Sequence, residues 1–174
     1  MVVNFFELLK VPVNFEIDNE MLSAHFRELQ QRYHPDVAGV APEQALQKSA
    51  EINLAFDTLR APDTRAGYLL RLRKQDAGLQ HSISDLEFLH TALELREQLD
   101  ESATPIELQG LQLELRQWLE ALGRQFILDF EDEDWVEARD TARKLAFMQN
   151  VLMDVEQKMD RLEDQEDDSL WDDD

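Results

Sequence analysis

Apolar residues recur every three or four positions along almost the whole of this chain. No window alternates apolar and polar residues with a period of two, and only five glycines are present. The first spacing places apolar side chains on one face of an α-helix, whereas a half-buried strand requires the second. We therefore expect an all-α protein.

Prolines and capping residues divide this pattern into separate helices. The residues that we expect to cap helices are Asn4, Asp18, Ser84 and Thr104. The expected helices cover residues 5–11, 19–33, 43–60, 63 or 64 to 73, 85–101, 105–130 and 133–162. Their short connections favour antiparallel neighbours.

The 174 residues suffice for two small helical units. We expect one over residues 1–74 and a three-helix bundle over 84–162. The linker, residues 75–83, contains Gly78 and few large apolar side chains. The last segment, 163–174, is almost entirely acidic, and we expect it to be disordered and solvated.

Charge and composition exclude several classes of function. The net charge is −21, from 38 acidic and 17 basic side chains, and such a surface repels nucleic acids and anionic membranes. The chain has no cysteine, which removes thiolate metal sites and disulfides. No apolar run is long enough to span a membrane, and no basic segment precedes the first apolar residues. We expect a cytoplasmic protein.

The tripeptide His34-Pro35-Asp36 lies between two helices of a predicted antiparallel pair. One interpretation is a turn that ends a helix, since proline and aspartate are common turn residues. A catalytic His-Asp pair is a second, but the two residues flank a proline and no serine or cysteine lies near them in sequence. The helix before the tripeptide ends with Arg27, Arg32 and Tyr33.

This setting resembles the J-domain of DnaJ-type proteins. The resemblance implies that the tripeptide and the basic face of the preceding helix dock on a DnaK-type chaperone and stimulate its ATP hydrolysis. Pro35 fixes its own φ and stiffens the segment. Asp36 offers a carboxylate to a basic surface, and His34 offers a planar donor and acceptor. The implied chaperone-binding residues are Arg27, Arg32, Tyr33, His34, Pro35 and Asp36.

The helix 85–101 carries more apolar surface than one buried face needs. One stripe consists of Phe88, Ala92, Leu95 and Leu99, and a second, rotated away from it, of Leu86, Leu89 and Leu93. The last helix has a steady apolar repeat from Leu145 to Leu162, with Phe147 and Val151 off it. A bundle helix buries one stripe, so the surplus residues contact a partner, pack between the units or widen the core.

Residues 1 to about 162 resemble the HscB family, the J-domain co-chaperones of iron–sulfur cluster assembly. The segments that carry the resemblance are Leu22-Ser23, Phe26, Tyr33-His34-Pro35-Asp36, Ile52-Asn53, Arg65-Ala66-Gly67-Tyr68-Leu69-Leu70, Leu93-Glu94-Leu95-Arg96-Glu97, Arg143-Lys144-Leu145 and Phe147. The glycine-rich and cysteine-rich regions of general DnaJ proteins are absent from the sequence.

The resemblance implies an L-shaped, monomeric, non-enzymatic adaptor without a cofactor or metal of its own. Its bundle binds the scaffold protein IscU and delivers it to the DnaK-type chaperone HscA. The implied scaffold-binding residues are Leu89, His90, Leu93, Glu94, Glu97 and Phe147, with His90 where we expect a more apolar residue.

Two alternatives remain open at the level of sequence. The chain could serve a different client through the same tripeptide. It could also be a metalloenzyme that uses acids together with His25, His34, His81 or His90, although no two of these histidines lie at the i, i+4 spacing of a helical ligand pair.

Overall fold

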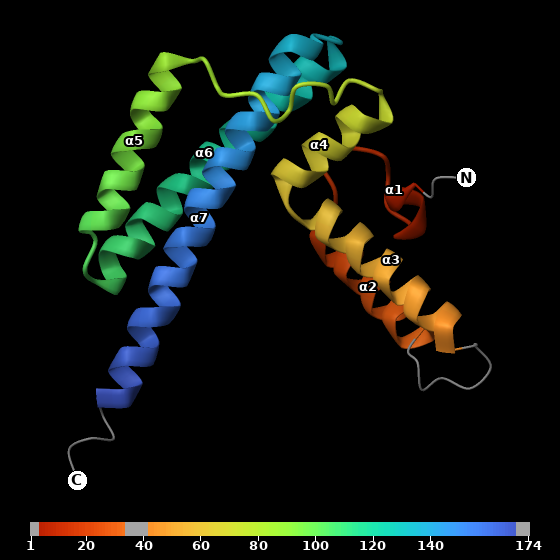
Figure 1. Cartoon of the computed structure of the whole chain (residues 1–174), viewed down its shortest axis with the longest axis horizontal. Coiled ribbons are helices and arrows are strands. Elements are labelled where there is room, and N and C mark those ends of the chain that lie inside the picture. The colour runs from red at the N-terminus through yellow and green to blue at the C-terminus, as the bar shows by residue number, and fades with distance from the viewer. Residues whose placement is uncertain (1–3, 34–41, 170–174) are drawn as a thin grey trace. The chain divides into compact units, whose positions relative to one another are not determined.

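The structure, a computed structural model, describes the backbone of residues 4–33 and 42–169, and in this part every regular element is an α-helix. The helices are α1 (Phe5–Leu8), α2 (Asn19–Arg32), α3 (Pro42–Arg60), α4 (Pro62–Leu72), α5 (Leu86–Glu101), α6 (Pro105–Glu131) and α7 (Trp135–Ser169) (Figure 1). The all-α prediction is confirmed. The chain divides into two compact units, Met1–Ala77 and Gly78–Asp174.

In the first unit, α2 and α3 form an antiparallel pair. The rings of Phe26 and Phe56 stack with centroids 4.1 Å apart. One turn further along α2, the Gln30 amide donates a hydrogen bond to Asn53, which lies earlier on α3. This reversed order of contacts is the signature of antiparallel helices. The largest fully buried side chains of this unit are Phe6, Leu9, Leu22, Ile52, Leu59 and Leu70.

The buried guanidinium of Arg65 ties three segments of the first unit together. From α4, its Nε donates to the Leu59 carbonyl oxygen and its Nη1 to the Phe15 carbonyl oxygen, both at 2.6 Å. A third hydrogen bond reaches the Arg60 carbonyl oxygen at 3.2 Å. Burial lowers the pKa of Arg65 to about 10. A planar fork of donors suits this task because it satisfies several carbonyl oxygens in fixed directions.

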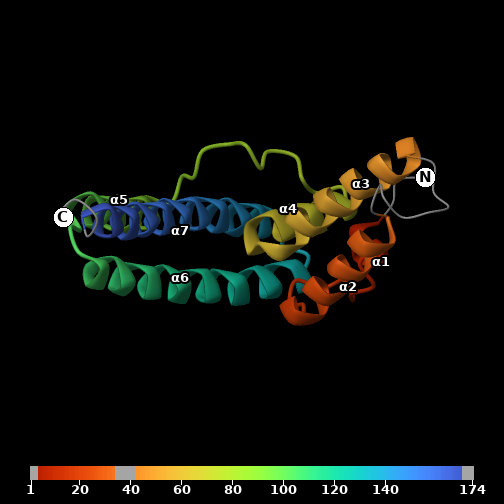
Figure 2. The ribbon, with the colours of Figure 1, turned by 90° about the horizontal axis from the view of Figure 1, so that it is seen from below.

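The second unit is a bundle of α5, α6 and α7. Contacts between α6 and α7 run in opposite directions, from Gln112–Glu156 at one end to Asp129–Thr141 at the other. Figure 2 shows these two helices side by side along most of the length of α6. Contacts between α5 and α7 run in the same direction, from Asp85–Lys144 to Leu99–Lys158, so α5 lies parallel to α7 and antiparallel to α6.

Three of the four predicted N-caps are confirmed. Asn4 accepts a hydrogen bond from the Phe6 backbone N–H, and Asp18 accepts from two backbone N–H groups. Thr104 and Glu107 form the expected capping box of α6. The prediction for α5 was wrong by one residue: Asp85, not Ser84, is the N-cap and accepts from the Glu87 and Phe88 backbone N–H groups. Both side chains are good N-caps, so residue type alone does not choose between them.

The predicted end of the last helix was also wrong. We expected a disordered segment from residue 163, but α7 continues to Ser169. Glutamate and glutamine are good helix formers, and neither glycine nor proline interrupts the segment. The helix therefore extends through residues whose high charge had indicated disorder.

Arg65→Lys is expected to destabilise the protein by about 3 kcal/mol, because an ammonium cannot satisfy the carbonyl oxygens that the guanidinium fork reaches. Urea denaturation of the full chain, followed by ellipticity, measures this. Arg60→Lys is the matched control, since the Arg60 side chain is 62% exposed. Equal shifts in the two variants would contradict the role given to Arg65.

Candidate functional site

Two lysines of α7 hold α5 in place, one at each end. Lys144 Nζ contacts the Asp85 carboxylate, the N-cap of α5, at 2.7 Å. Lys158 Nζ donates to the Leu99 carbonyl oxygen at 2.6 Å and to that of Asp100 at 3.2 Å, in the last turn of the helix. A cation at the C-terminal carbonyl groups of a helix also complements its dipole. The position and rotation of α5 on α7 follow from these contacts.

The rotation separates the two apolar stripes of α5 as predicted. Phe88, Ala92, Leu95 and Leu99 are buried, and Leu86, Leu89 and Leu93 are 80%, 37% and 56% exposed. At 100° per residue, the buried stripe spans about 60° of the helix surface. The opposite side, an arc of about 140°, is hereafter the α5 face. It consists of Leu86, Leu89, His90, Leu93, Glu94 and Glu97, all of which are exposed.

Within the α5 face, His90 and Glu94 lie one helical turn apart with His90 Nε2 3.4 Å from a Glu94 carboxylate oxygen. Glu97 lies one turn beyond Leu93. The predicted residues of α5 therefore share one surface, in which leucines alternate with a histidine and two carboxylates.

Phe147 of α7 lies beside α5 and is half-buried. Its ring packs edge-on against Phe88, with centroids 5.9 Å apart, and the Arg96 guanidinium carbon lies 5.3 Å from its centroid. Arg96 was not among the predicted site residues. Val151, one turn further along α7, is fully buried, so it belongs to the core and not to a surplus surface.

A hollow of about 480 Å³ joins Phe147 to the α5 face, because Leu89 and Phe147 both line it. We call it the linker hollow, since residues 79–83 form one wall. Its lining residues are Leu79, His81, Ser82, Ile83, Leu89, Arg143, Ala146, Phe147 and Asn150. Nothing in the spacing of residues 79–83 had indicated that they border this surface.

A cluster of charged groups stabilises the junction of α5 and α7. Lys144 Nζ lies 2.9 Å from an Asp140 carboxylate oxygen as well as close to Asp85. The hydrogen bond from Lys144, helped by the Phe88 backbone N–H, lowers the pKa of Asp85. Burial alone raises the pKa of Asp140, but hydrogen bonds from Lys144 and Arg143 outweigh it and lower that pKa. Burial likewise lowers the pKa of Lys144, and its two carboxylate partners raise it overall.

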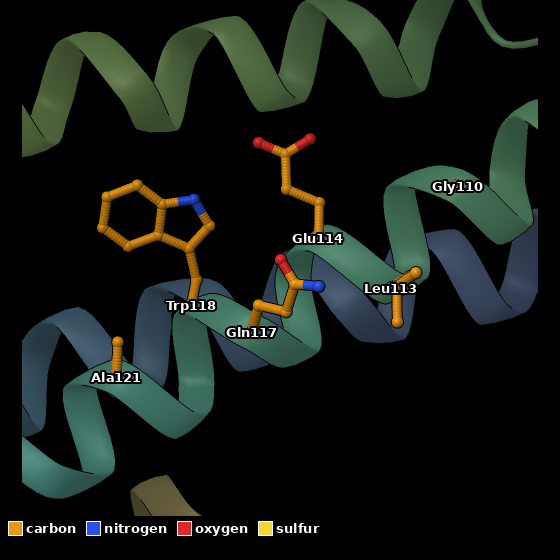
Figure 3. A pocket seen from close by; sticks show the side chains of 6 residues that line it. All are labelled: Gly110, Leu113, Glu114, Gln117, Trp118 and Ala121. Carbon is orange, nitrogen blue, oxygen red and sulfur yellow. The ribbon is translucent and has the colours of Figure 1, made fainter.

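Two further hollows lie along α6, away from the predicted site. One, of about 520 Å³, is lined by Gly110, Leu113, Glu114, Gln117, Trp118 and Ala121 (Figure 3). The other, of about 510 Å³, includes Glu101, Glu107 and Glu114. Both are bordered by carboxylates, whereas no acidic residue lines the linker hollow.

In the first unit, the predicted tripeptide His34-Pro35-Asp36 lies outside the described residues. The structure does place α2 and α3 on either side of it in sequence. Arg27 and Arg32 are exposed on α2, but five residues separate them, which is about 140° around the helix. Arg32 instead lies near Tyr33, with 5.9 Å between its guanidinium carbon and the ring centroid.

Among the side chains that the structure describes, those of residues 4–33 and 43–164, no group of three or more His, Asp or Glu is arranged to hold a metal ion. In the same part of the chain, none of the helices is long and apolar enough to cross a membrane.

Comparisons with known proteins agree with both units. Residues 4–68 match the family model of the DnaJ domain, and residues 84–167 match that of the HSCB C-terminal oligomerisation domain. The chain is 54% identical over 172 residues to the co-chaperone protein HscB homolog of Acinetobacter baumannii, which covers 99% of both chains. It is 37% identical over 163 residues to the homolog of Photobacterium profundum, covering 88% of this chain and 95% of that one.

Solved structures share the fold. Chaperone HscB from Vibrio cholerae matches with a TM-score of 0.73 at 34% identity, over 92% of this chain and 99% of the other. Human co-chaperone protein HscB matches in fold with a TM-score of 0.75 at 23% identity, over 90% and 82% of the two chains.

A DnaJ-type unit followed by a helical bundle with an exposed apolar face defines a co-chaperone of the J-domain class. Within that class, the chain belongs to the HscB family. The resemblance drawn from the sequence is confirmed.

The Lys144 cluster predicts a specific response to acid. The pKa values of Asp85 and Asp140 lie below 3.8 in the fold, so their ion pairs stabilise it above that pH. This stabilisation is lost as the pH falls through the lowered pKa values. As the pH falls below about 4, the melting temperature is therefore expected to fall less in Lys144→Met than in the natural chain.

Thermal melting followed by tryptophan fluorescence measures the effect, because Trp118 and Trp135 both lie in the second unit. Lys10→Met is the control, since Lys10 pairs with Glu28 on the exposed surface of the first unit. An unchanged pH dependence in Lys144→Met would show that the cluster does not contribute as described.

Proposed function

We propose that this chain binds the DnaK-type chaperone HscA through its J-domain, stimulates its ATP hydrolysis, and presents to it the iron–sulfur scaffold protein IscU. It acts in the cytoplasm as a monomeric adaptor and carries out no chemistry of its own. Residues 1–74 form the chaperone-binding domain in this proposal, and residues 84–162 the scaffold-binding domain.

The observation that carries the proposal is the α5 face. Leu86, Leu89 and Leu93 are exposed together while the other stripe of the same helix fills the core. Exposed apolar residues are ordinary when scattered, but a contiguous group on one helix is typical of a protein-binding surface. Family membership supports a co-chaperone that holds a client there.

Phe147 supports the same surface from α7. Its ring is fixed between Phe88 and Arg96, so little conformational entropy remains to be lost when a partner covers it. Aromatic residues held in this way commonly contribute much of the binding free energy of an interface.

For the first unit, the proposal rests on the tripeptide and its sequence neighbours. Arg27 and Arg32 are exposed cations on a strongly acidic protein, where they can steer an acidic surface of the chaperone. Because they lie about 140° apart around α2, Arg27 contacts the chaperone separately from the pair of Arg32 and Tyr33.

His34→Gln is expected to abolish the stimulation of HscA ATPase activity while leaving ellipticity and scaffold binding unchanged. The imidazole supplies a planar donor and acceptor that glutamine does not reproduce in shape. Single-turnover ATP hydrolysis measures the effect, and IscU binding by the same variant is the internal control. Full stimulation by His34→Gln would refute the role given to the tripeptide.

Leu93→Ala combined with Phe147→Ala is expected to weaken IscU binding at least about tenfold, because two apolar anchors are lost. Titration calorimetry measures the affinity, and stimulation of HscA without scaffold is expected to persist. The single variant Leu93→Ala is measured as well. It is expected to fold normally, since the Leu93 side chain is 56% exposed.

Leu113→Ala is the matched control, a leucine 61% exposed on α6 in the hollow of Figure 3. Unchanged IscU affinity in the double variant would contradict the proposed interface. A chain that stimulates HscA but does not bind IscU would point to a different client.

A further inference from the structure

We propose that the linker hollow is part of the client-binding surface and receives an aliphatic side chain of the scaffold protein. This inference rests on the proposed function and extends it to residues outside the predicted site. Leu89 and Phe147 line both the hollow and the proposed interface, so a partner that covers them also covers the mouth of the hollow.

The wall of the hollow is fixed before any partner binds. Gly78 adopts a left-handed φ of +85°, and its carbonyl oxygen accepts the His81 backbone N–H at 3.0 Å. The same oxygen accepts a hydrogen bond from Arg143 Nη1 at 3.1 Å. This left-handed φ favours glycine, and a β-carbon at Gly78 would lie 3.0 Å from His81 Nδ1, so the His81 ring would also have to shift.

The other terminus of this wall is fixed as well. Asp85 caps α5 and pairs with Lys144. Arg143 Nη2 pairs with Asp140 at 2.8 Å, which directs the guanidinium toward Gly78. The segment 79–83 is thus held on α7 at both of its ends, although the sequence had indicated a linker. A preformed wall lowers the entropic cost of binding.

The lining of the hollow indicates which side chain it accepts. Five of the nine lining residues are apolar: Leu79, Ile83, Leu89, Ala146 and Phe147. No acidic residue lines it, and the charge of Arg143 is already balanced by Asp140. This neutrality contrasts with the net charge of −21 and with the glutamates of the α6 hollows. An uncharged aliphatic side chain therefore fits best.

Asn150 gives the hollow a polar edge. It is exposed on α7, one turn beyond Phe147 in sequence position. Its amide can hydrogen-bond a backbone group of the partner beside the inserted side chain. Pockets that combine an apolar lining with a few polar groups in this way recognise one residue with its flanking backbone.

The inference is tested by filling the linker hollow with a large side chain. Asn150→Phe places a large side chain over it, and Gln117→Phe makes the same kind of change at the comparable hollow on α6 (Figure 3). Both residues are exposed, so both variants are expected to keep the ellipticity of the natural chain. In calorimetric titration with IscU, Asn150→Phe is expected to lower affinity about tenfold or more, and Gln117→Phe to leave it unchanged.

Ile83→Ala provides a second, milder test by removing part of the wall, and an affinity loss of several-fold is expected. Ile106→Ala, at an isoleucine 80% exposed on α6, is its control. Natural or tighter binding by both Asn150→Phe and Ile83→Ala would overturn the inference. If Leu93→Ala with Phe147→Ala still weakens binding in that case, the proposed function stands. If that variant also binds normally, the proposed function fails with it.

Discussion

The attachment of α5 to α7 by two lysines determines what the second unit presents to its surroundings. A helix of 16 residues is marginal by itself in water, so its position must come from tertiary contacts. Lys144 and Lys158 are about four turns apart on one side of α7, and they bind the two ends of α5. Between these ends the stripe from Phe88 to Leu99 is buried. The exposed leucines are the consequence of that rotation.

The two units use a buried cation in different ways. Arg65 satisfies carbonyl oxygens where chain segments meet, and burial lowers its pKa. Lys144 is paired with two carboxylates, and its pKa is raised. Each unit therefore has its own polar anchor beside its own apolar core. This organisation allows the proposed chaperone-binding and scaffold-binding surfaces to be altered one at a time.

Much of the fold could be predicted because helical spacing and N-caps are local properties of the sequence. The split of the α5 leucines was predicted for the same reason, since a regular helix fixes the angle between its residues. For Val151 the sequence left open a partner contact, packing between the units or a wider core, and its burial selects the last, because a long helix between two others buries more than one stripe. The linker hollow could not be predicted: it depends on the Gly78 turn and on Arg143, which lies 65 residues away in sequence. The tripeptide remains a prediction from sequence, since it lies outside the described residues.

The net charge of the chain affects which partners its apolar surfaces can bind. An acidic protein repels most acidic partners at long range, which lowers the rate of unproductive encounters. The α5 leucines are uncharged and no acidic residue lines the linker hollow, so the binding proposed there depends on shape and on apolar area. Glu94 and Glu97 border the same face and disfavour a partner that brings carboxylates to it. The selectivity that we propose for this surface thus combines an apolar contact with an acidic border that disfavours partners carrying carboxylates at the same place.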